Sequence, residues 1–148
     1  MTSPQHRRIC CVLDTQVVLD WVLFDDPRMS HWAQAIQSRS VHWVYSAAMR
    51  DEALRVLHYP ALRKRHDPAH STRRLIACFA CWGECCAAPH TQRQLVCTDP
   101  DDQMFLDLAL ARQASHLLSR DHAVLRLAPR ARPFGLRISP PEAAPVPD

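Results

Sequence analysis

The first clear pattern along the chain is a short apolar run, followed after one acidic residue by apolar residues at helical spacing. Residues 9–13 are continuously apolar and rich in branched side chains, which is typical of a strand buried on both faces of a parallel sheet. After Asp14 the apolar residues fall at positions 17, 18, 21 and 22, the spacing of the buried face of an amphipathic helix. Asp14 therefore stands where a strand becomes a helix.

Strand-like and helix-like patterns continue to alternate along the chain. Helices are predicted over residues 15–24, 28–38, 47–59, 71–86 and 100–113, with a shorter helical segment from 122 and a helix or loop over 61–70. Strands are predicted over 41–45, 115–119 and 134–138, while 87–97 is a connection in which 94–97 is extended. Such alternation indicates an α/β fold with a mostly parallel central sheet.

Length and composition favour one domain with one core. The chain has 148 residues, of which 47% are hydrophobic, and this is enough to bury a single good core. We assign residues 1–138 to this domain. The remaining segment, 139–148, holds four prolines without apolar periodicity, so we expect a disordered tail.

Charge and glycine content exclude some classes of function. The net charge of +3 is mild and does not by itself indicate a nucleic-acid-binding protein. The two glycines are too few for a glycine-rich phosphate loop. No apolar run approaches the roughly 18 residues of a membrane span, and the first residues lack the design of a signal peptide. We therefore expect a soluble, cytoplasmic protein.

The cysteines are expected to be reduced. Their number, seven, is odd, and a core of this size does not need disulfides. Cys78, Cys81, Cys85 and Cys86 form a cluster with the spacing of zinc ligands or of small residues on the buried face of a helix. Zinc sites usually add a second, distant pair of ligands. None stands out here, so core packing is the favoured interpretation.

Acidic residues recur where strands give way to helices. Asp14 follows the first strand, Asp121 follows a later one, Asp102 lies in the first turn of a helix, and Glu52 lies about one and a half turns into the helix after the second strand. Helices that begin at one edge of a sheet would aim these carboxylates into a common cleft. Crowded carboxylates are stable mainly around a shared hard cation, so they favour Mg²⁺ or Mn²⁺. Such ions serve phosphoryl chemistry.

Four segments, in order and with suitable spacing over residues 9–127, resemble the successive motifs of the PIN-domain nucleases, in particular the toxin components of prokaryotic toxin–antitoxin pairs related to VapC. They are Val12-Leu13-Asp14-Thr15; Ser46 with Glu52 and the segment 54–60; Asp99-Pro100-Asp101-Asp102 with Phe105, Leu106 and Ala109; and Ser119-Arg120-Asp121 with Leu125. The resemblance implies a three-layer α/β/α sandwich and a Mg²⁺- or Mn²⁺-dependent endoribonuclease. It further implies a homodimer that a separate antitoxin protein inhibits.

Carried over position by position, the resemblance assigns the four acids of the family to Asp14, Glu52, Asp102 and Asp121, as metal ligands and catalytic residues. Asp102 is preferred over Asp99 and Asp101 because only Asp102 is followed at three, four and seven residues by Phe105, Leu106 and Ala109. Thr15 and Ser119 match hydroxyl positions that support the acids. Gln16 stands where the family usually has Asn, so its support of Asp14 is an open question.

Other residues near these motifs have simpler explanations. Asp99 and Asp101 have a structural reason at the helix start, although Asp99 is retained as a supporting residue. His122 beside Asp121 is an alternative proton shuttle, and surface placement is the favoured interpretation. Ordinary surface or loop positions are expected for five acids: Asp20, Asp25, Asp26, Asp51 and Asp107.

The favoured hypothesis is hydrolysis of RNA phosphodiester bonds. Arg50, Arg55 and Arg120 lie near the motifs and would hold an RNA backbone, together with basic residues in segments 63–65 and 73–74. Phosphatases with an aspartate nucleophile need a second Asp at position 16, where this chain has Gln16. The main alternative is a catalytically decayed PIN-like module that binds RNA or a protein partner.

Overall fold

The computed structural model describes residues 9–90 and 94–147. Within these residues one five-stranded sheet forms the centre of the molecule, in the order β3-β2-β1-β4-β5. Every pairing between neighbouring strands is parallel. The strands are β1 (Ile9–Leu13), β2 (Val41–Ser46), β3 (Gly83–Cys86), β4 (His116–Leu118) and β5 (Arg137–Ser139).

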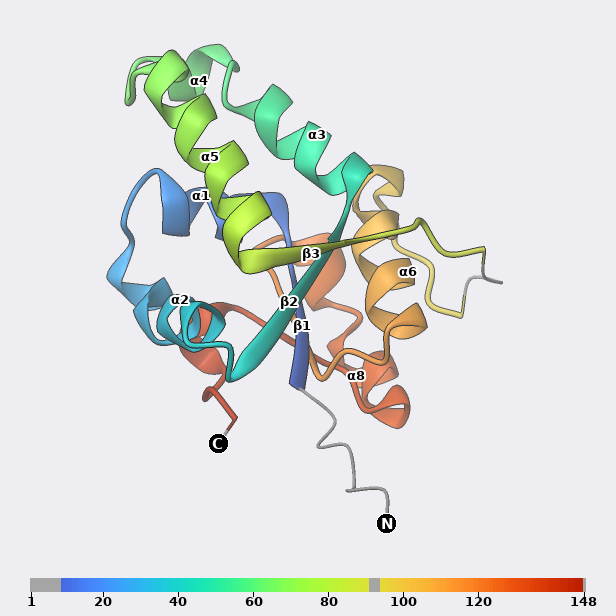
Figure 1. Cartoon of the computed structure of the whole chain (residues 1–148). Coiled ribbons are helices and arrows are strands. Elements are labelled where there is room, and N and C mark those ends of the chain that lie inside the picture. Colours follow the sequence, from blue (N-terminus) through green and yellow to red (C-terminus); the bar gives the residue numbers. More distant parts are fainter. Residues whose placement is uncertain (1–8, 91–93, 148) are drawn as a thin grey trace.

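Helices cover both faces of this sheet. Crossovers between parallel strands are right-handed, so the steps from β1 to β2 and β3 carry their helices to one face, and the return to β4 and β5 carries the later helices to the other (Figure 1). The α-helices are α1 (Thr15–Val22), α2 (Ser30–Gln37), α3 (Ala47–Val56), α4 (Pro60–Arg63), α5 (Pro68–Trp82), α6 (Gln103–Ala111), α7 (His122–Leu125) and α8 (Ala128–Ala131). Short 3-10 helices are η1 (Pro27–Met29), η2 (Pro100–Asp102), η3 (Arg132–Phe134) and η4 (Pro141–Ala143).

This architecture confirms the predicted three-layer α/β/α fold. The apolar block that opens the pattern is the central strand β1, in which Cys11 and Val12 are fully buried. Their side chains point to opposite faces because side chains alternate along a strand. A strand with helices on both faces must therefore be apolar at consecutive positions, which is the pattern that the sequence displays.

No helix among residues 9–90 and 94–147 is long and apolar enough to cross a bilayer.

An aromatic cluster fills the core on the side of α1 and α5. Trp43 and Tyr45 of β2 meet Phe79 of α5 at ring-centroid distances of 4.9 and 4.7 Å, and Trp21 of α1 packs edge-on against Trp43 at 5.5 Å. Edge-on and tilted aromatic pairs add to the stabilisation that burial alone provides. The cluster joins α1 and α5 to the sheet.

The predicted helix over 71–86 is wrong in its last four residues. Helix α5 ends at Trp82, and residues 83–86 form β3 along the edge of the sheet. The cause is Gly83: its backbone runs directly beside the Tyr45 ring, and a Cβ atom there would lie 2.6 Å from a ring carbon. Only a residue without a side chain allows the chain to turn from α5 into a pairing with β2 at this distance.

The change of structure at Gly83 also corrects the prediction for the cysteine cluster. Cys78 is buried under α5 as expected, but Cys81 and Cys85 are exposed and Cys86 is half-buried on β3. The four residues therefore do not share one buried helix face. All seven cysteines are free thiols.

The C-terminal segment differs from the expected disordered tail. Residues 140–147 are described and include η4, in which Pro141 is buried. The indole Nε1 of Trp32 donates a hydrogen bond of 2.9 Å to the carbonyl oxygen of Ala144, and Glu142 pairs with Arg120 at 2.7 Å. Proline content removes backbone donors without preventing such side-chain contacts. The segment is held by partners far away in the sequence, which local composition does not reveal.

Substitution of Gly83 by alanine is expected to destabilise the fold. The added methyl group meets the Tyr45 ring inside a close-packed cluster, so the free energy of unfolding should fall by about 1–3 kcal/mol. Urea titration followed by tryptophan fluorescence measures this change. Cys85→Ser on the same strand is the control and should shift the free energy by less than about 0.5 kcal/mol. Equal stability of the two variants would contradict the role assigned to Gly83.

Candidate active site

The strand order reverses direction between β1 and β4, and this point defines the site. In open parallel sheets ligands bind outside the carboxyl ends of the strands where the order reverses. Leu13 and Leu118, the last residues of the two strands, pair in register, and the backbone N–H of Asp14 donates to the carbonyl oxygen of Leu118 at 3.0 Å. Asp14 and the loop after β4 are therefore held side by side.

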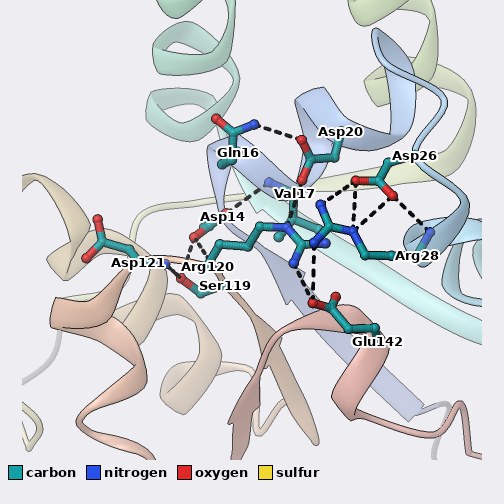
Figure 2. A network of polar contacts seen from close by, with 10 residues as sticks. All are labelled: Asp14, Gln16, Val17, Asp20, Asp26, Arg28, Ser119, Arg120, Asp121 and Glu142. Atoms are coloured by element: carbon teal, nitrogen blue, oxygen red, sulfur yellow. Dashed lines mark hydrogen bonds and ion pairs between the residues drawn. The ribbon is translucent and has the colours of Figure 1, made fainter.

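Asp14 is a buried carboxylate with every oxygen in use. It caps α1, since its Oδ1 accepts a 3.0 Å hydrogen bond from the backbone N–H of Val17. Its Oδ2 accepts from the Ser119 hydroxyl and from the backbone N–H of Arg120 at 3.3 Å (Figure 2). Only 5% of the residue is exposed, and burial raises the pKa of Asp14 to about 6 although these hydrogen bonds oppose the shift. The hydrogen bonds fix its orientation.

Glu52 reaches the site from α3. The helix begins directly after β2, at the same edge of the sheet, so a residue one and a half turns along it faces back toward α1. There its Oε2 accepts a hydrogen bond from the Thr15 hydroxyl. The residue after Asp14 thus supports a second acid from a different strand–helix unit.

Three further acids form a tight group on the other side of Asp14. One carboxylate oxygen from each of Asp99, Asp102 and Asp121 lies within 4.8 Å of the others. Asp99 caps η2 through the N–H of Asp101 at 3.0 Å, and Asp121 caps α7 through the N–H of Ala123 at 2.8 Å. The cap bonds use one oxygen of each residue. The second oxygen of each remains for another partner.

Asp102 is the member of this group that lacks a compensating donor. Its Oδ2 atom is buried and has no hydrogen-bond partner among the described residues. Burial, followed by the negative charges of Asp121, Asp99 and Asp14, raises the pKa of Asp102 to about 7. A buried carboxylate oxygen without a donor is costly in a protein. A proton or a bound cation would supply the missing partner.

One open pocket of about 350 Å³ brings these features together. All four acids assigned from the sequence line it, with Val56 and Phe105 as its apolar wall; the remaining lining residues are Thr15, Gln16 and Arg120. Asp14 and Glu52 lie outside the closest acidic group but share the pocket with it. Asp101 is exposed and does not line the pocket, and the same holds for His122.

The residues present fit a hard divalent cation. The convergent donors are carboxylate oxygens, which Mg²⁺ and Mn²⁺ prefer over the nitrogen and sulfur donors typical of zinc. The unpartnered oxygen of Asp102 and the raised pKa values describe a site that is short of positive charge. A cation would both offset the repulsion among the carboxylates and give Oδ2 of Asp102 a partner. Of the described residues, only Asp99, Asp102 and Asp121 group closely enough to form such a ligand set.

Three residues of the predicted set meet beside the pocket. The Nε2 of Gln16, whose support of Asp14 the sequence left open, donates to Oδ1 of Asp20 at 2.7 Å, and no hydrogen bond to Asp14 is found among the described residues. Asp20, expected on the helix surface, is 6% exposed. Arg120, expected to hold RNA, donates from Nε to Asp20 at 2.8 Å and pairs through Nη1 with Glu142 at 2.7 Å. The i, i+4 spacing of Gln16 and Asp20 on α1 was the available signal for their contact, whereas the partners of Arg120 come from distant segments.

The comparison with protein families decides the classification. Residues 11–123, most of the chain, match the family model described as PIN domain. The chain belongs to the PIN-domain family. PIN domains are typically nucleases, and membership of this family is consistent with a hydrolase.

A solved structure gives the same fold. It is a chain of the crystal structure of VapBC2 from Rickettsia felis bound to a DNA fragment from their promoter, with a TM-score of 0.59, 10% identity, and coverage of 88% of this chain and 97% of that chain. At this identity the likeness concerns the fold. A search of curated proteins found no match.

Metal-free stability should depend on pH through Asp102. Its pKa is raised from 3.8 to about 7 on folding, so at intermediate pH the folded protein holds a proton that the unfolded chain has released. The free energy of unfolding therefore falls as pH rises through this window. Asp102→Asn removes this loss, so with a chelator present the variant should melt a few degrees above the wild type at pH 7.5 and match it near pH 3.5.

Thermal unfolding across this pH range measures the effect. Asp51→Asn, which removes an exposed carboxylate next to Glu52, is the control and should show no such pH-dependent gain. A difference between the Asp102→Asn variant and the wild type that stays constant with pH would contradict the assignment.

Proposed function

We propose that this PIN domain is a metal-dependent endoribonuclease that hydrolyses RNA phosphodiester bonds. The observation that carries the proposal is the single pocket lined by Asp14, Glu52, Asp102 and Asp121, in which an oxygen of Asp102 lacks a donor. The arrangement of acids around a hard cation is suited to phosphoryl chemistry rather than to nucleophilic catalysis by a side chain. Mg²⁺ or Mn²⁺ is the proposed cofactor.

In this mechanism the acids of the pocket would bind a divalent cation and hold it in place. When bound, Mg²⁺ or Mn²⁺ would supply a water nucleophile at neutral pH and neutralise charge on the phosphate. Asp102 and Asp121, with Asp99 beside them, would provide the closest oxygens, and Asp14 and Glu52 would complete the pocket wall. Ser119 and Thr15 hold Asp14 and Glu52 in fixed orientations through their hydroxyl groups. A fixed orientation lowers the entropic cost of assembling the reacting groups.

An RNA backbone needs positive charge beside this acidic pocket. Arg55 is exposed on α3, three residues after Glu52, and Arg50 is half-buried two residues before it. These two residues are the proposed phosphate contacts. Arg120 is not, because Asp20 and Glu142 already neutralise its charge. Binding through phosphate contacts should weaken with salt.

A second candidate function is a decayed module that binds RNA or a protein without cleaving. The observation that favours it is the position of Gln16, whose amide contacts Asp20 rather than Asp14. Calorimetric titration with Mn²⁺ separates the two functions. A decayed site would show no binding.

The biological setting proposed for this enzyme is that of the toxin in a toxin–antitoxin pair. The support is the fold shared with a chain of the VapBC2 structure together with the motif resemblance. We propose a cytoplasmic homodimer whose activity a cognate antitoxin protein inhibits. An inhibitor of this kind is needed because an uncontrolled RNA hydrolase would damage the cell that makes it.

Removal of any pocket acid is expected to stop cleavage. Asp14→Asn, Glu52→Gln and Asp102→Asn should each lower the rate of RNA cleavage by about 100-fold or more, because each removes a carboxylate that would bind the cation or hold its ligands in place. The assay follows a labelled RNA with Mn²⁺ and with excess chelator. Asp51→Asn, adjacent to Glu52 but exposed, should cleave at the wild-type rate. Chelator-resistant cleavage would contradict the metal mechanism.

Expression in a bacterial host tests the toxin role. The wild type should arrest growth on induction, and the Asp102→Asn variant, which keeps the fold but lacks a ligand, should not. Growth curves with immunoblots at matched protein levels measure the difference. Arrest by both proteins would show that toxicity does not arise from the pocket.

A further inference from the structure

An ion-pair network around the half-buried Arg120 ties the C-terminal segment to the wall of the pocket. Arg120 lies between Ser119 and Asp121 in the loop after β4, and its guanidinium is bound on one side by Asp20 of α1 and on the other by Glu142 of η4. Figure 2 shows the side chain extending from the loop beside Asp14 to these two carboxylates. Asp20 is held in turn by Gln16, which also lines the pocket.

The backbone of Arg120 touches the site directly. Its N–H donates to Oδ2 of Asp14, and the N–H of Asp121 donates to the Ser119 hydroxyl at 3.0 Å, which itself donates to Asp14. The loop is thus attached to α1 at two points: at Asp14 through hydrogen bonds of the loop, and at Asp20 through the Arg120 side chain. Two attachments fix both the distance and the angle between Asp14 and Asp121.

Glu142, which also binds Arg120, lies outside the segment that matches the family model. The family match ends at residue 123, whereas Glu142 lies on a 3-10 helix held by its own contacts, including the hydrogen bond from Trp32 to Ala144. Arg28 also faces Glu142 at 3.7 Å and is paired with Asp26 at 2.7 Å. The Arg120 side chain is 18% exposed, while that of Glu142 is 38% exposed. The pair between Arg120 and Asp20, whose side chain is 9% exposed, is therefore screened less by solvent than the pair between Arg120 and Glu142.

We propose that Arg120 is a positioning residue for the acidic pocket and that Glu142 of the C-terminal segment sets its conformation. The inference rests on the proposed function, since it concerns the same cation site. Arg120 acts by holding the loop that carries Asp121 against Asp14. Its positive charge is not the useful property, because a positive charge near the pocket opposes cation binding.

The sign of one measurement separates positioning from simple electrostatics. Removing the charge of Arg120 without any change in geometry should strengthen Mn²⁺ binding. The positioning role predicts the opposite: Arg120→Gln should bind Mn²⁺ about 10-fold more weakly, the loss typical of groups that orient metal ligands. Arg120→Lys keeps the charge but cannot bridge Asp20 and Glu142 with a planar fork, so it should be weakened as well.

Calorimetric Mn²⁺ titration of the full chain tests the proposal, with thermal unfolding of each variant as the measure of folding. Glu142→Gln changes a more exposed residue and should weaken binding in the same direction as Arg120→Gln, even where the Arg120 variants prove unstable. Asp26→Asn is the matched control: it removes a carboxylate whose hydrogen bonds and ion pair are made with Arg28, and whose charge acts on Arg120 only from a distance. It should leave the affinity within about 2-fold of the wild type.

The outcomes distinguish this proposal from the function on which it rests. Binding by the wild type with equal or tighter binding by Arg120→Gln and Glu142→Gln overturns the positioning role alone. Equal weakening by Asp26→Asn and Glu142→Gln also overturns it, because the effect would then be one of general charge. Absence of Mn²⁺ binding by the wild type overturns the proposed cofactor and the positioning role together.

Discussion

Repulsion among carboxylates is the constraint that organises this molecule. Asp14, Asp102 and Asp121 converge where the strand order reverses, and the protein's own donors satisfy them unequally: Asp14 receives three hydrogen bonds, while Oδ2 of Asp102 receives none. A fold does not collect buried negative charge without a compensating partner. The raised pKa values of Asp14 and Asp102 express this deficit. The deficit is the physical basis for proposing a divalent cation as the missing component.

The surrounding helices and strands fix the positions of these acidic side chains. Aromatic packing of Trp43, Tyr45 and Phe79 fixes α5 on the sheet, and α3 continues from β2 so that Glu52 reaches the pocket. The hydroxyl groups of Thr15 and Ser119 then fix the orientation of the Glu52 and Asp14 side chains through hydrogen bonds. Rigid elements carry the acids, and short-range hydrogen bonds aim them. This division of labour is expected for a site whose ligands must be ordered before the metal arrives.

The gathering of the four acids in one pocket could be expected from the sequence because its signals are local. Each acid has a short-range pattern: a carboxylate after an apolar strand, an Asp-Pro helix start, or an acid one and a half turns into a helix. The parallel topology then brings these positions to one edge of the sheet. The cysteine cluster and the role of Gln16 did not follow. Gly83 ends α5 through its fit to Tyr45, and Gln16 finds Asp20 rather than Asp14. At Gly83 a tertiary contact with Tyr45 ended the helical pattern, whereas the contact between Gln16 and Asp20 follows the i, i+4 spacing of α1.

The sequence by itself determined the α/β alternation, the buried first strand and the strand-to-helix junctions at one edge of the sheet, since hydrophobic period and chain order are sufficient for these. The choice of the four acids rested on the motif resemblance. Only the tertiary structure decided that the C-terminal segment is held against the domain and that Arg120 binds Asp20 and Glu142. Their partners, Trp32, Asp20 and Glu142, are between 22 and 112 residues away along the chain. No local pattern encodes such contacts, because they depend on how the completed layers bring distant surfaces together.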